Sequence, residues 1–250
     1  GVKVTYQDKV VVVTGAGEGI GRSIALRYAE LGAKVVVADR NENTGRETVD
    51  MIYDSNGSGI YFCSDVTREK DVVRLMENII YCYGKIDVLV NNVGKMYKKP
   101  IMDLALDEWQ GIISSNLTSV YLCVREAVKY MKAVSQGSIV NIASSQKFMT
   151  EPDKEAFAAA NGGIIHMTKS LATSLDKSNI QGNCISPGYT QAVDYQRLSS
   201  CTEPVDTAFD INTSQDVAIA CVHLTLEDNG YVNGSNIVID TGLIRKVVHI

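Results

Sequence analysis

The chain has 250 residues, of which 45% are hydrophobic and 21% charged, and its formal net charge is -5 at pH 7. This length is enough for one large α/β domain with a buried core and a cleft, and the composition is that of a globular protein. An acidic chain without a long basic run argues against nucleic acid or an anionic membrane as its partner, and its longest apolar stretches are far shorter than a bilayer span.

Strand and helix patterns alternate along the chain. The predicted strands are short, continuously apolar runs at residues 9–14, 34–38, 59–63, 86–91, 138–142, 180–186 and 236–240. The predicted helices lie at residues 19–31, 44–53, 68–83, 107–115, 120–134, 154–176 and 215–225. Strands without polar alternation are typical of a parallel sheet covered by helices on both faces, so we predict a doubly wound α/β fold.

No linker, repeat or low-complexity segment divides the chain, so we expect residues 1–250 to form a single domain. Residues 189–212 are less regular than the rest and mix polar residues with few clear strand or helix patterns. An irregular excursion of this length at the edge of a sheet is often a lid over a ligand, which we expect here, with a plain surface connection as the alternative.

The six cysteines and three histidines form no metal-binding pattern. None of the cysteines belongs to a C-x-x-C pair, so we expect most of them to be small buried hydrophobes in a reducing, cytoplasmic environment. We expect no metal site.

A glycine-rich loop joins the first predicted strand to the first predicted helix. It reads Thr14-Gly15-Ala16-Gly17-Glu18-Gly19-Ile20-Gly21. Glycines let the backbone approach a pyrophosphate closely, and the free N–H groups at the start of a helix bind that anion. A tight turn without a ligand is the alternative, but the position between the first strand and its helix favours a dinucleotide site.

An acidic residue, Asp39, follows the second predicted strand at about twenty residues from the loop, which is the spacing of dinucleotide sites. A carboxylate there accepts hydrogen bonds from the adenosine ribose hydroxyls and repels the 2′-phosphate of NADP. Glu18 acts in the same direction, whereas Arg40 is a mild counter-argument. We therefore predict NAD(H) as the cofactor.

Further motifs follow the loop in chain order. They are Asp65-Val66 after the third strand, Asn91-Asn92-Val93-Gly94 after the fourth, Asn116, a strand ending in Ser144, Pro187-Gly188 after the sixth strand, and a closing strand within residues 231–242. Together with the T-G-x-x-x-G-x-G loop, this series resembles the short-chain dehydrogenase/reductase family over nearly the whole chain. The resemblance implies a Rossmann-type sheet of about seven parallel strands, a small-molecule substrate or ligand, and assembly as a homo-oligomer, either a dimer or a tetramer.

The loop and the resemblance together assign roles to named residues. The predicted cofactor-binding set comprises Gly15, Gly17, Glu18, Gly19, Ile20, Gly21, Asp39, Arg40, Asp65, Val66, Asn92, Gly94, Pro187, Gly188 and Thr190. Ser144 corresponds to the serine that polarises the substrate carbonyl, and Asn116 to the asparagine that supports a water relay. Ala192 stands where the family often has a threonine that binds the nicotinamide amide, so we expect weaker anchoring of the nicotinamide.

Two positions depart from the catalytic pattern of the family. There, a tyrosine transfers the proton at the substrate oxygen, and a lysine four residues later lowers the pKa of that tyrosine from its free value near ~10. These two positions are Phe157 and Asn161 in this chain. Phenylalanine has no proton to give and asparagine carries no charge, and general acid–base catalysis is worth roughly 10²–10⁴-fold in rate. The resemblance therefore implies that ordinary alcohol or carbonyl turnover is weak or absent.

Three functional hypotheses follow. In the first, the protein is a catalytically impaired relative that still binds NAD(H), as a sensor or a non-catalytic subunit. In the second, it is an active NAD-dependent oxidoreductase with another proton donor, for which the candidates are Lys95, Tyr97, Lys98, Lys99, Lys147, Glu151, Asp153, Lys154 and Tyr189. In the third, it is a scaffold that has lost the cofactor as well, and the intact glycine loop and Asp39 argue against it.

Overall fold

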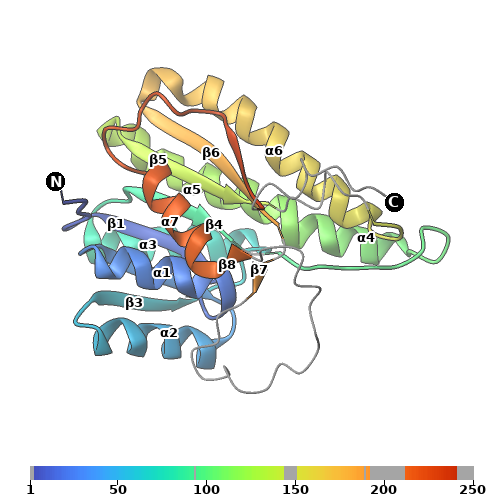
Figure 1. Cartoon of the computed structure of the whole chain (residues 1–250), viewed down its shortest axis with the longest axis horizontal. Coiled ribbons are helices and arrows are strands. Elements are labelled where there is room, and N and C mark those ends of the chain that lie inside the picture. The colour runs from blue at the N-terminus through green and yellow to red at the C-terminus, as the bar shows by residue number, and fades with distance from the viewer. Residues whose placement is uncertain (1–2, 93, 144–150, 189, 192–211, 241–250) are drawn as a thin grey trace.

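The computed structural model describes residues 3–92, 94–143, 151–188, 190–191 and 212–240. Seven parallel strands form one sheet in the order β3-β2-β1-β4-β5-β6-β9 (Figure 1). Their bounds are β1 Val10–Thr14, β2 Lys34–Asp39, β3 Ser58–Cys63, β4 Val88–Asn91, β5 Gly137–Ile142, β6 Ile180–Pro187 and β9 Asn236–Ile239. The predicted doubly wound, seven-stranded α/β fold is confirmed.

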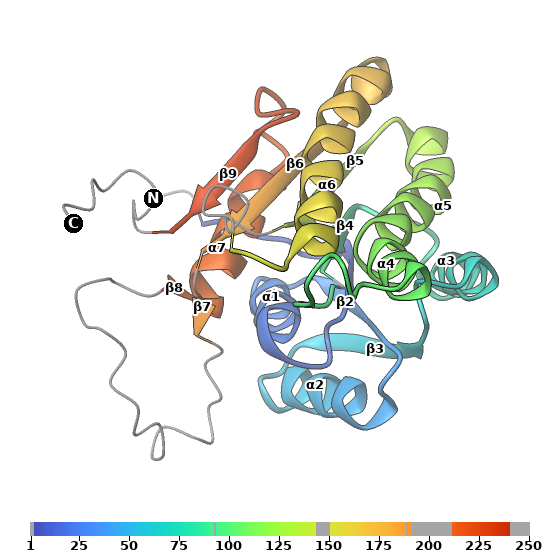
Figure 2. The same ribbon diagram turned by 90° about the vertical axis from the view of Figure 1, so that its right-hand side faces the viewer.

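Helices follow the strands along the chain. Their bounds are α1 Gly19–Glu30, α2 Glu42–Asp54, α3 Glu69–Tyr83, α4 Leu106–Ile113, α5 Ser119–Val134, α6 Glu155–Leu175 and α7 Ser214–Leu224. Figure 2 shows α3, α5 and α6 on one face of the sheet, and α1, α2 and α7 on the other. Because all seven strands are parallel, their carboxyl ends share one edge of the sheet, and this is the edge at which α/β folds bind their ligands.

Two hydrophobic cores, one on each face, explain why the strands are apolar at every position. In β1, Val10 and Val12 belong to the core under α3, α5 and α6, whereas Val11 and Val13 belong to the core under α1 and α7. Successive side chains of a strand point to opposite faces, so both sets must be apolar when both faces are covered.

The predicted strands and helices differ from the observed ones mainly at their ends. The fourth strand begins at Val88 rather than at residue 86, although the backbone of Asp87 still bonds to Val10 and Ser138. A short parallel pair, β7 (Thr190–Gln191) and β8 (Asn212–Thr213), was not predicted. The rest of the proposed lid, at residues 189 and 192–211, lies outside the described residues.

A π-helical turn, Ser114–Thr118, joins α4 directly to α5 where the sequence suggested a break between two helices. Ser115 and Asn116 are buried within it. Such turns insert an extra residue into a helix and often occur at functional sites. The turn rotates Asn116 toward the loop that follows β4, with consequences for the site.

A chain of buried polar side chains ties α6 to the sheet below the carboxyl edge. Asn91 Nδ2 donates to Asn141 Oδ1 at 2.8 Å, and Asn141 Nδ2 donates to Thr168 Oγ1 at 3.0 Å. Thr168, which is 1% exposed, donates in turn to the carbonyl of Ile164 at 2.7 Å. Buried polar groups are costly unless they are paired, so this chain fixes how α6 lies on β4 and β5.

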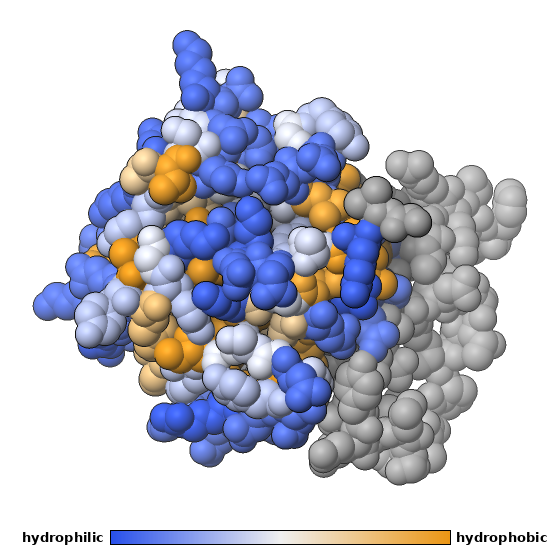
Figure 3. Space-filling model, turned by 90° about the vertical axis from the view of Figure 1, so that its left-hand side faces the viewer, coloured by the Kyte–Doolittle hydropathy of each residue, from blue (hydrophilic) through white to orange (hydrophobic). Residues whose placement is uncertain are grey.

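The remaining expectations concern the burial of the cysteines, membrane-spanning helices and metal sites. Cys123, Cys184 and Cys221 are buried as expected, whereas Cys63 and Cys82 are exposed. In the ranges that the structure describes, no helix is both long and apolar enough to cross a bilayer, and no three His, Cys, Asp or Glu side chains gather as they would around a metal ion. Apolar side chains are dispersed among hydrophilic ones on the face shown in Figure 3.

We expect Thr168→Val to reduce the free energy of unfolding by about 1–3 kcal/mol, because it leaves the buried amide of Asn141 without its acceptor. Thr173→Val, at an exposed position of the same helix, is the matched control and should change stability little. Urea denaturation followed by circular dichroism measures both. Equal stabilities of the two variants would show that the buried chain does not hold α6.

Candidate cofactor-binding site

A cleft of about 530 Å³ opens beyond the carboxyl ends of β1 to β4. Its lining includes eight of the predicted cofactor-binding residues: Gly15, Glu18, Asp39, Arg40, Asp65, Val66, Asn92 and Gly94. Strand order reverses at β1, which has β2 on one side and β4 on the other. This switch point is where doubly wound sheets bind their ligands.

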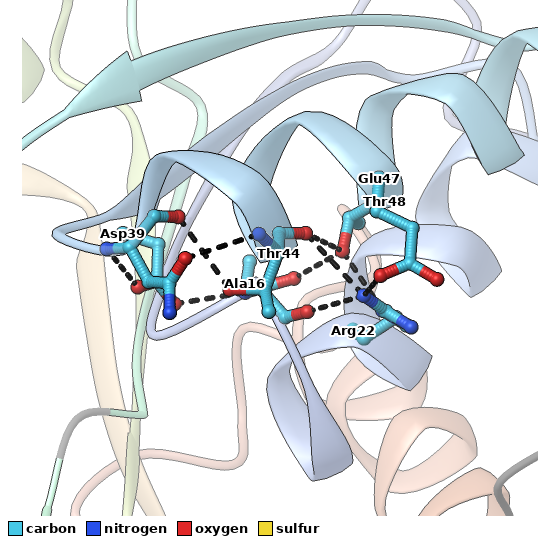
Figure 4. A network of polar contacts seen from close by, with 8 residues as sticks. Ala16, Arg22, Asp39, Thr44, Glu47 and Thr48 are labelled. Atoms are coloured by element: carbon cyan, nitrogen blue, oxygen red, sulfur yellow. Dashed lines mark hydrogen bonds and ion pairs between the residues drawn. The ribbon is translucent and has the colours of Figure 1, made fainter.

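Asp39 is bonded to the glycine loop in addition to facing the cleft. Its Oδ2 accepts from the backbone N–H of Gly17 at 2.9 Å, and its Oδ1 accepts from the N–H of Asn41 at 2.9 Å (Figure 4). A Cβ at position 17 would lie 2.8 Å from Oδ2 and 2.6 Å from Thr44 Oγ1. A side chain at position 17 would therefore displace the Asp39 carboxylate or Thr44 from the loop.

Gly21 lets α1 pack against the start of the loop. A Cβ at this position would lie only 2.1 Å from the carbonyl oxygen of Gly15, which is closer than any side chain tolerates. Asn92 adds a bond from its Nδ2 to the same carbonyl at 3.4 Å. The first turn of α1, which contains Gly19 and Ile20, therefore begins directly beside the end of β1.

Asp65 forms the wall of the cleft after β3. Its Oδ1 accepts from the backbone N–H of Thr67 at 3.0 Å and from the Thr67 hydroxyl at 2.6 Å. Partial burial raises the pKa of Asp65, but the bonds from Thr67 and the charges of Arg40 and Arg68 outweigh it, so the pKa lies below its usual value. Asp65 is thus an anionic acceptor at neutral pH.

Asn116 holds the loop after β4 in place. Its Oδ1 accepts from the backbone N–H of Lys95 at 2.8 Å, and its Nδ2 donates to the carbonyl of Lys95 at 2.8 Å. Both polar atoms of the Asn116 side chain therefore bond to the backbone of Lys95, as the backbone of a neighbouring strand would do in a sheet. Gly94 lies against the same side chain, because a Cβ there would be 3.6 Å from Asn116.

The positions that depart from the catalytic pattern lie in the first two turns of α6. Phe157 is half-buried, and Asn161 is 5% exposed. Residues 144–150, with Ser144 and Lys147, lie outside the described residues, as does Tyr189. Pro187 ends β6, and the N–H of Gly188 bonds to the carbonyl of Ile239 at 2.7 Å, so both lie beyond β5 and outside the lining of the cleft. Thr190 is described only as part of the backbone of β7.

Tyr97 and Lys99, two candidate proton donors, share one carboxylate. The Tyr97 hydroxyl donates to Glu108 Oε1 at 2.5 Å, and Lys99 Nζ lies 2.7 and 2.9 Å from the two oxygens. The bonds from Lys99 and Tyr97 lower the pKa of Glu108 to about 2. The bond to Glu108 raises the pKa of Tyr97, which makes its phenolate harder to form.

The loop before α6 is joined to the same cluster. The N–H of Lys99 donates to the carbonyl of Asp153 at 2.7 Å, and Lys154 Nζ lies 2.7 Å from Glu151 Oε2. Three of the candidate donors, Lys99, Glu151 and Lys154, are thus paired with opposite charges, whereas Lys95 and Lys98 are exposed.

Three residues near the cleft were not singled out from the sequence. Arg22 and Thr48 bond to the carbonyls of the glycine loop. Ser64, just before Asp65, lines the cleft, and its buried Oγ has no hydrogen-bond partner in the part of the chain that the structure describes. The position of Arg22 immediately after Gly21 was the only signal for any of them in the sequence.

Comparison with known proteins agrees with this geometry. A model of the short-chain dehydrogenase family matches residues 9–202. An oxidoreductase of Thermotoga maritima is 35% identical over 97% of this chain and 98% of its own length, and the 3-oxoacyl-acyl-carrier-protein reductase of Chlamydia pneumoniae is 31% identical over 96% and 98%. The crystal structure of a hydroxysteroid dehydrogenase from Escherichia coli superposes with a TM-score of 0.87 at 27% identity, covering 96% of this chain and 98% of that one.

The chain therefore belongs to the short-chain dehydrogenase family, a family of oxidoreductases that use NAD or NADP. The resemblance inferred from the sequence motifs is confirmed at this level.

We expect the contribution of Glu108 to stability to depend on pH. Its pKa in the folded protein is lowered from 4.5 to about 2, so the stabilisation is complete above the higher value and is lost as the pH falls through the lower one. The stability difference between the wild type and Glu108→Gln should shrink across this interval in urea titrations. Glu77→Gln, which removes an exposed carboxylate from α3, is the control and should show no such trend. A pH-independent difference for Glu108→Gln would contradict the assignment.

Proposed function

We propose that the protein binds NAD(H) in the cleft beyond β1 to β4. The observation that carries this proposal is the Asp39 carboxylate, which two backbone N–H groups hold at the edge of the cleft beside the glycine loop. There it is placed for the ribose hydroxyls of an adenosine, and the first turn of α1 offers N–H groups to a diphosphate.

Other groups in the cleft also suit a dinucleotide. Asp65 and Val66 lie on the wall after β3, where they would contact the adenine. The residues present therefore fit the cofactor that the family uses.

The preference for NAD(H) over NADP(H) rests on charge. Asp39 and Glu18 both line the cleft and would repel a 2′-phosphate, whereas Arg40 alone would attract it. Asp39 also has no freedom to turn away, because both of its oxygens are bonded to backbone N–H groups.

We expect Asp39→Asn to weaken NADH binding by about 10- to 100-fold, since a hydrogen bond to a charged group contributes about 1.5–3 kcal/mol. The same change should raise the affinity for NADPH relative to NADH, because the repulsion is removed. Fluorescence titration measures both affinities, with Asp50→Asn on the exposed side of α2 as the control. An unchanged ratio of the two affinities would rule out Asp39 as the selecting residue.

We further propose that ordinary hydride-transfer turnover is weak or absent. Bound NAD(H) would supply or accept the hydride, but the chain must hold or move a proton at the substrate oxygen. Phe157 has no proton to transfer, and Asn161 has no charge with which to lower a neighbouring pKa.

The alternative, an active oxidoreductase with another proton donor, finds less support among the described candidates. Tyr97 and Lys99 both bond to Glu108, and that bond raises the pKa of each of them. A tyrosine with a raised pKa is a poorer base near neutral pH, which is the opposite of what the family's lysine achieves for its tyrosine. These contacts favour a protein that binds NAD(H) without rapid turnover.

We expect the double variant Phe157→Tyr/Asn161→Lys to oxidise NADH with ketones or sugars roughly 10²- to 10⁴-fold faster than the natural protein. The control variant Phe157→Tyr/Ala159→Lys places the same charge at an exposed position of α6 and should gain little. A substrate panel followed by NADH absorbance measures all three proteins. Efficient turnover by the natural protein would overturn the proposal and require a different proton donor.

A further inference from the structure

The back of the glycine loop is held by two side chains from different helices. Thr48 Oγ1, in α2, donates to the carbonyl of Ala16 at 2.8 Å, and Arg22 Nη2, in α1, donates to the carbonyl of Gly17 at 2.6 Å (Figure 4). The carbonyls of Ala16 and Gly17, which follow each other in the loop, are therefore both held by side-chain donors.

Arg22 and Thr48 are also bonded to each other. Arg22 Nε donates to Thr48 Oγ1 at 3.0 Å, and Nη2 reaches the carbonyl of Thr44 at 3.3 Å. Thr48 is fully buried, and the side chain of Arg22 is 19% exposed. The two side chains, named here the loop brace, thus form one hydrogen-bonded unit behind the loop, in which Thr48 is buried and Arg22 is partly buried. The ion pair of Arg22 with the exposed Glu47 adds little, because surface pairs are weak.

The orientation of the carbonyls determines where the N–H groups of the loop point. A trans peptide is planar, so its C=O and N–H groups point in opposite directions. The carbonyl of Ala16 faces Thr48, and the N–H of Gly17 accordingly reaches Asp39. By the same rule, a Gly17 carbonyl held by Arg22 turns the N–H of Glu18 away from the guanidinium of Arg22.

Glu18 is the N-cap residue immediately before α1, and it lines the cleft. Its N–H and those of the first turn of α1 form the anion-binding end of the helix. The loop brace therefore acts on the N–H groups that a diphosphate needs, without touching the ligand itself.

We propose that the loop brace is a positioning device for the diphosphate of the cofactor: Arg22 and Thr48 hold the loop so that the Glu18 N–H and the first turn of α1 face it. This inference rests on the proposed NAD(H) site. It assigns Arg22 and Thr48 a larger effect on the diphosphate part of the ligand than on the adenosine part. Asp39 keeps its bond to the N–H of Asn41 when the loop shifts, and Asp65 lies apart from the loop after β3.

The test compares two ligands that differ in the diphosphate. ADP-ribose contains it and adenosine does not, and ligand-observed NMR titration measures both affinities. The variants are Thr48→Val, which removes the hydroxyl but keeps the shape, and Arg22→Lys, which keeps the charge but replaces the two donor nitrogens Nε and Nη2 with one. Thr48→Ser restores the hydroxyl, and Arg46→Lys changes an exposed arginine of α2 as the control.

We expect Thr48→Val and Arg22→Lys to weaken ADP-ribose about tenfold while adenosine changes less than about twofold, since one or two hydrogen bonds behind the loop are lost. Thr48→Ser should regain the wild-type affinity, and Arg46→Lys should not alter it. Unchanged ADP-ribose affinity in both brace variants would overturn the inference. An equal loss for both ligands would also overturn it, because that result indicates a general disturbance of the fold.

If the wild type binds neither ligand, the proposed NAD(H) site is wrong, and the brace is then judged without a ligand. Hydrogen exchange of the backbone N–H groups of Glu18 and Gly19 should be faster in Arg22→Lys than in Arg46→Lys if the brace holds the loop. Equal exchange in the two variants would refute the brace itself.

Discussion

A parallel sheet buried on both faces constrains everything else in this molecule. Because the valines of β1 alternate between two cores, polar side chains have no place along the middle of the strand. They gather where strands end, and Asp39, Asp65 and Asn92 therefore meet at the carboxyl edge although they are far apart in the sequence. The buried asparagines near that edge, Asn91 and Asn141, bond to each other and to α6 through three of their four side-chain polar atoms, whereas Asn91 Oδ1 has no partner among the described residues. The cleft is thus a consequence of how the sheet is covered.

The same constraint explains why so much of the fold was predictable. Continuous apolar runs and helical periodicity locate every strand of the main sheet to within a residue or two. The π-helical turn at Asn116 was not predictable in this way, since the apolar periodicity on either side is that of an ordinary helix and the extra residue depends on packing. The β7–β8 pair was missed because two-residue strands leave no pattern.

The site residues that could be identified from the sequence are those that lie close to one another along the chain. The glycines and Asp39 could be recognised because loop, helix start and strand end are adjacent in the chain or separated by one βαβ unit. The contacts of Arg22 with Thr48, and of Tyr97 and Lys99 with Glu108, depend on how side chains fold back across helices and loops. No spacing in the sequence specifies such contacts. The sequence offered Tyr97 only as one candidate proton donor, and its bond to Glu108 became evident from the structure.

Asn116 has a structural role that does not depend on any catalytic one. Both polar atoms of its side chain bond to the backbone of Lys95, so the residue secures a loop whether or not a proton relay passes nearby. Selection for folding alone would retain it in a lineage that no longer turns over substrate. An asparagine bonded in this way is maintained by the architecture of the loop after β4, whatever chemistry the cleft performs.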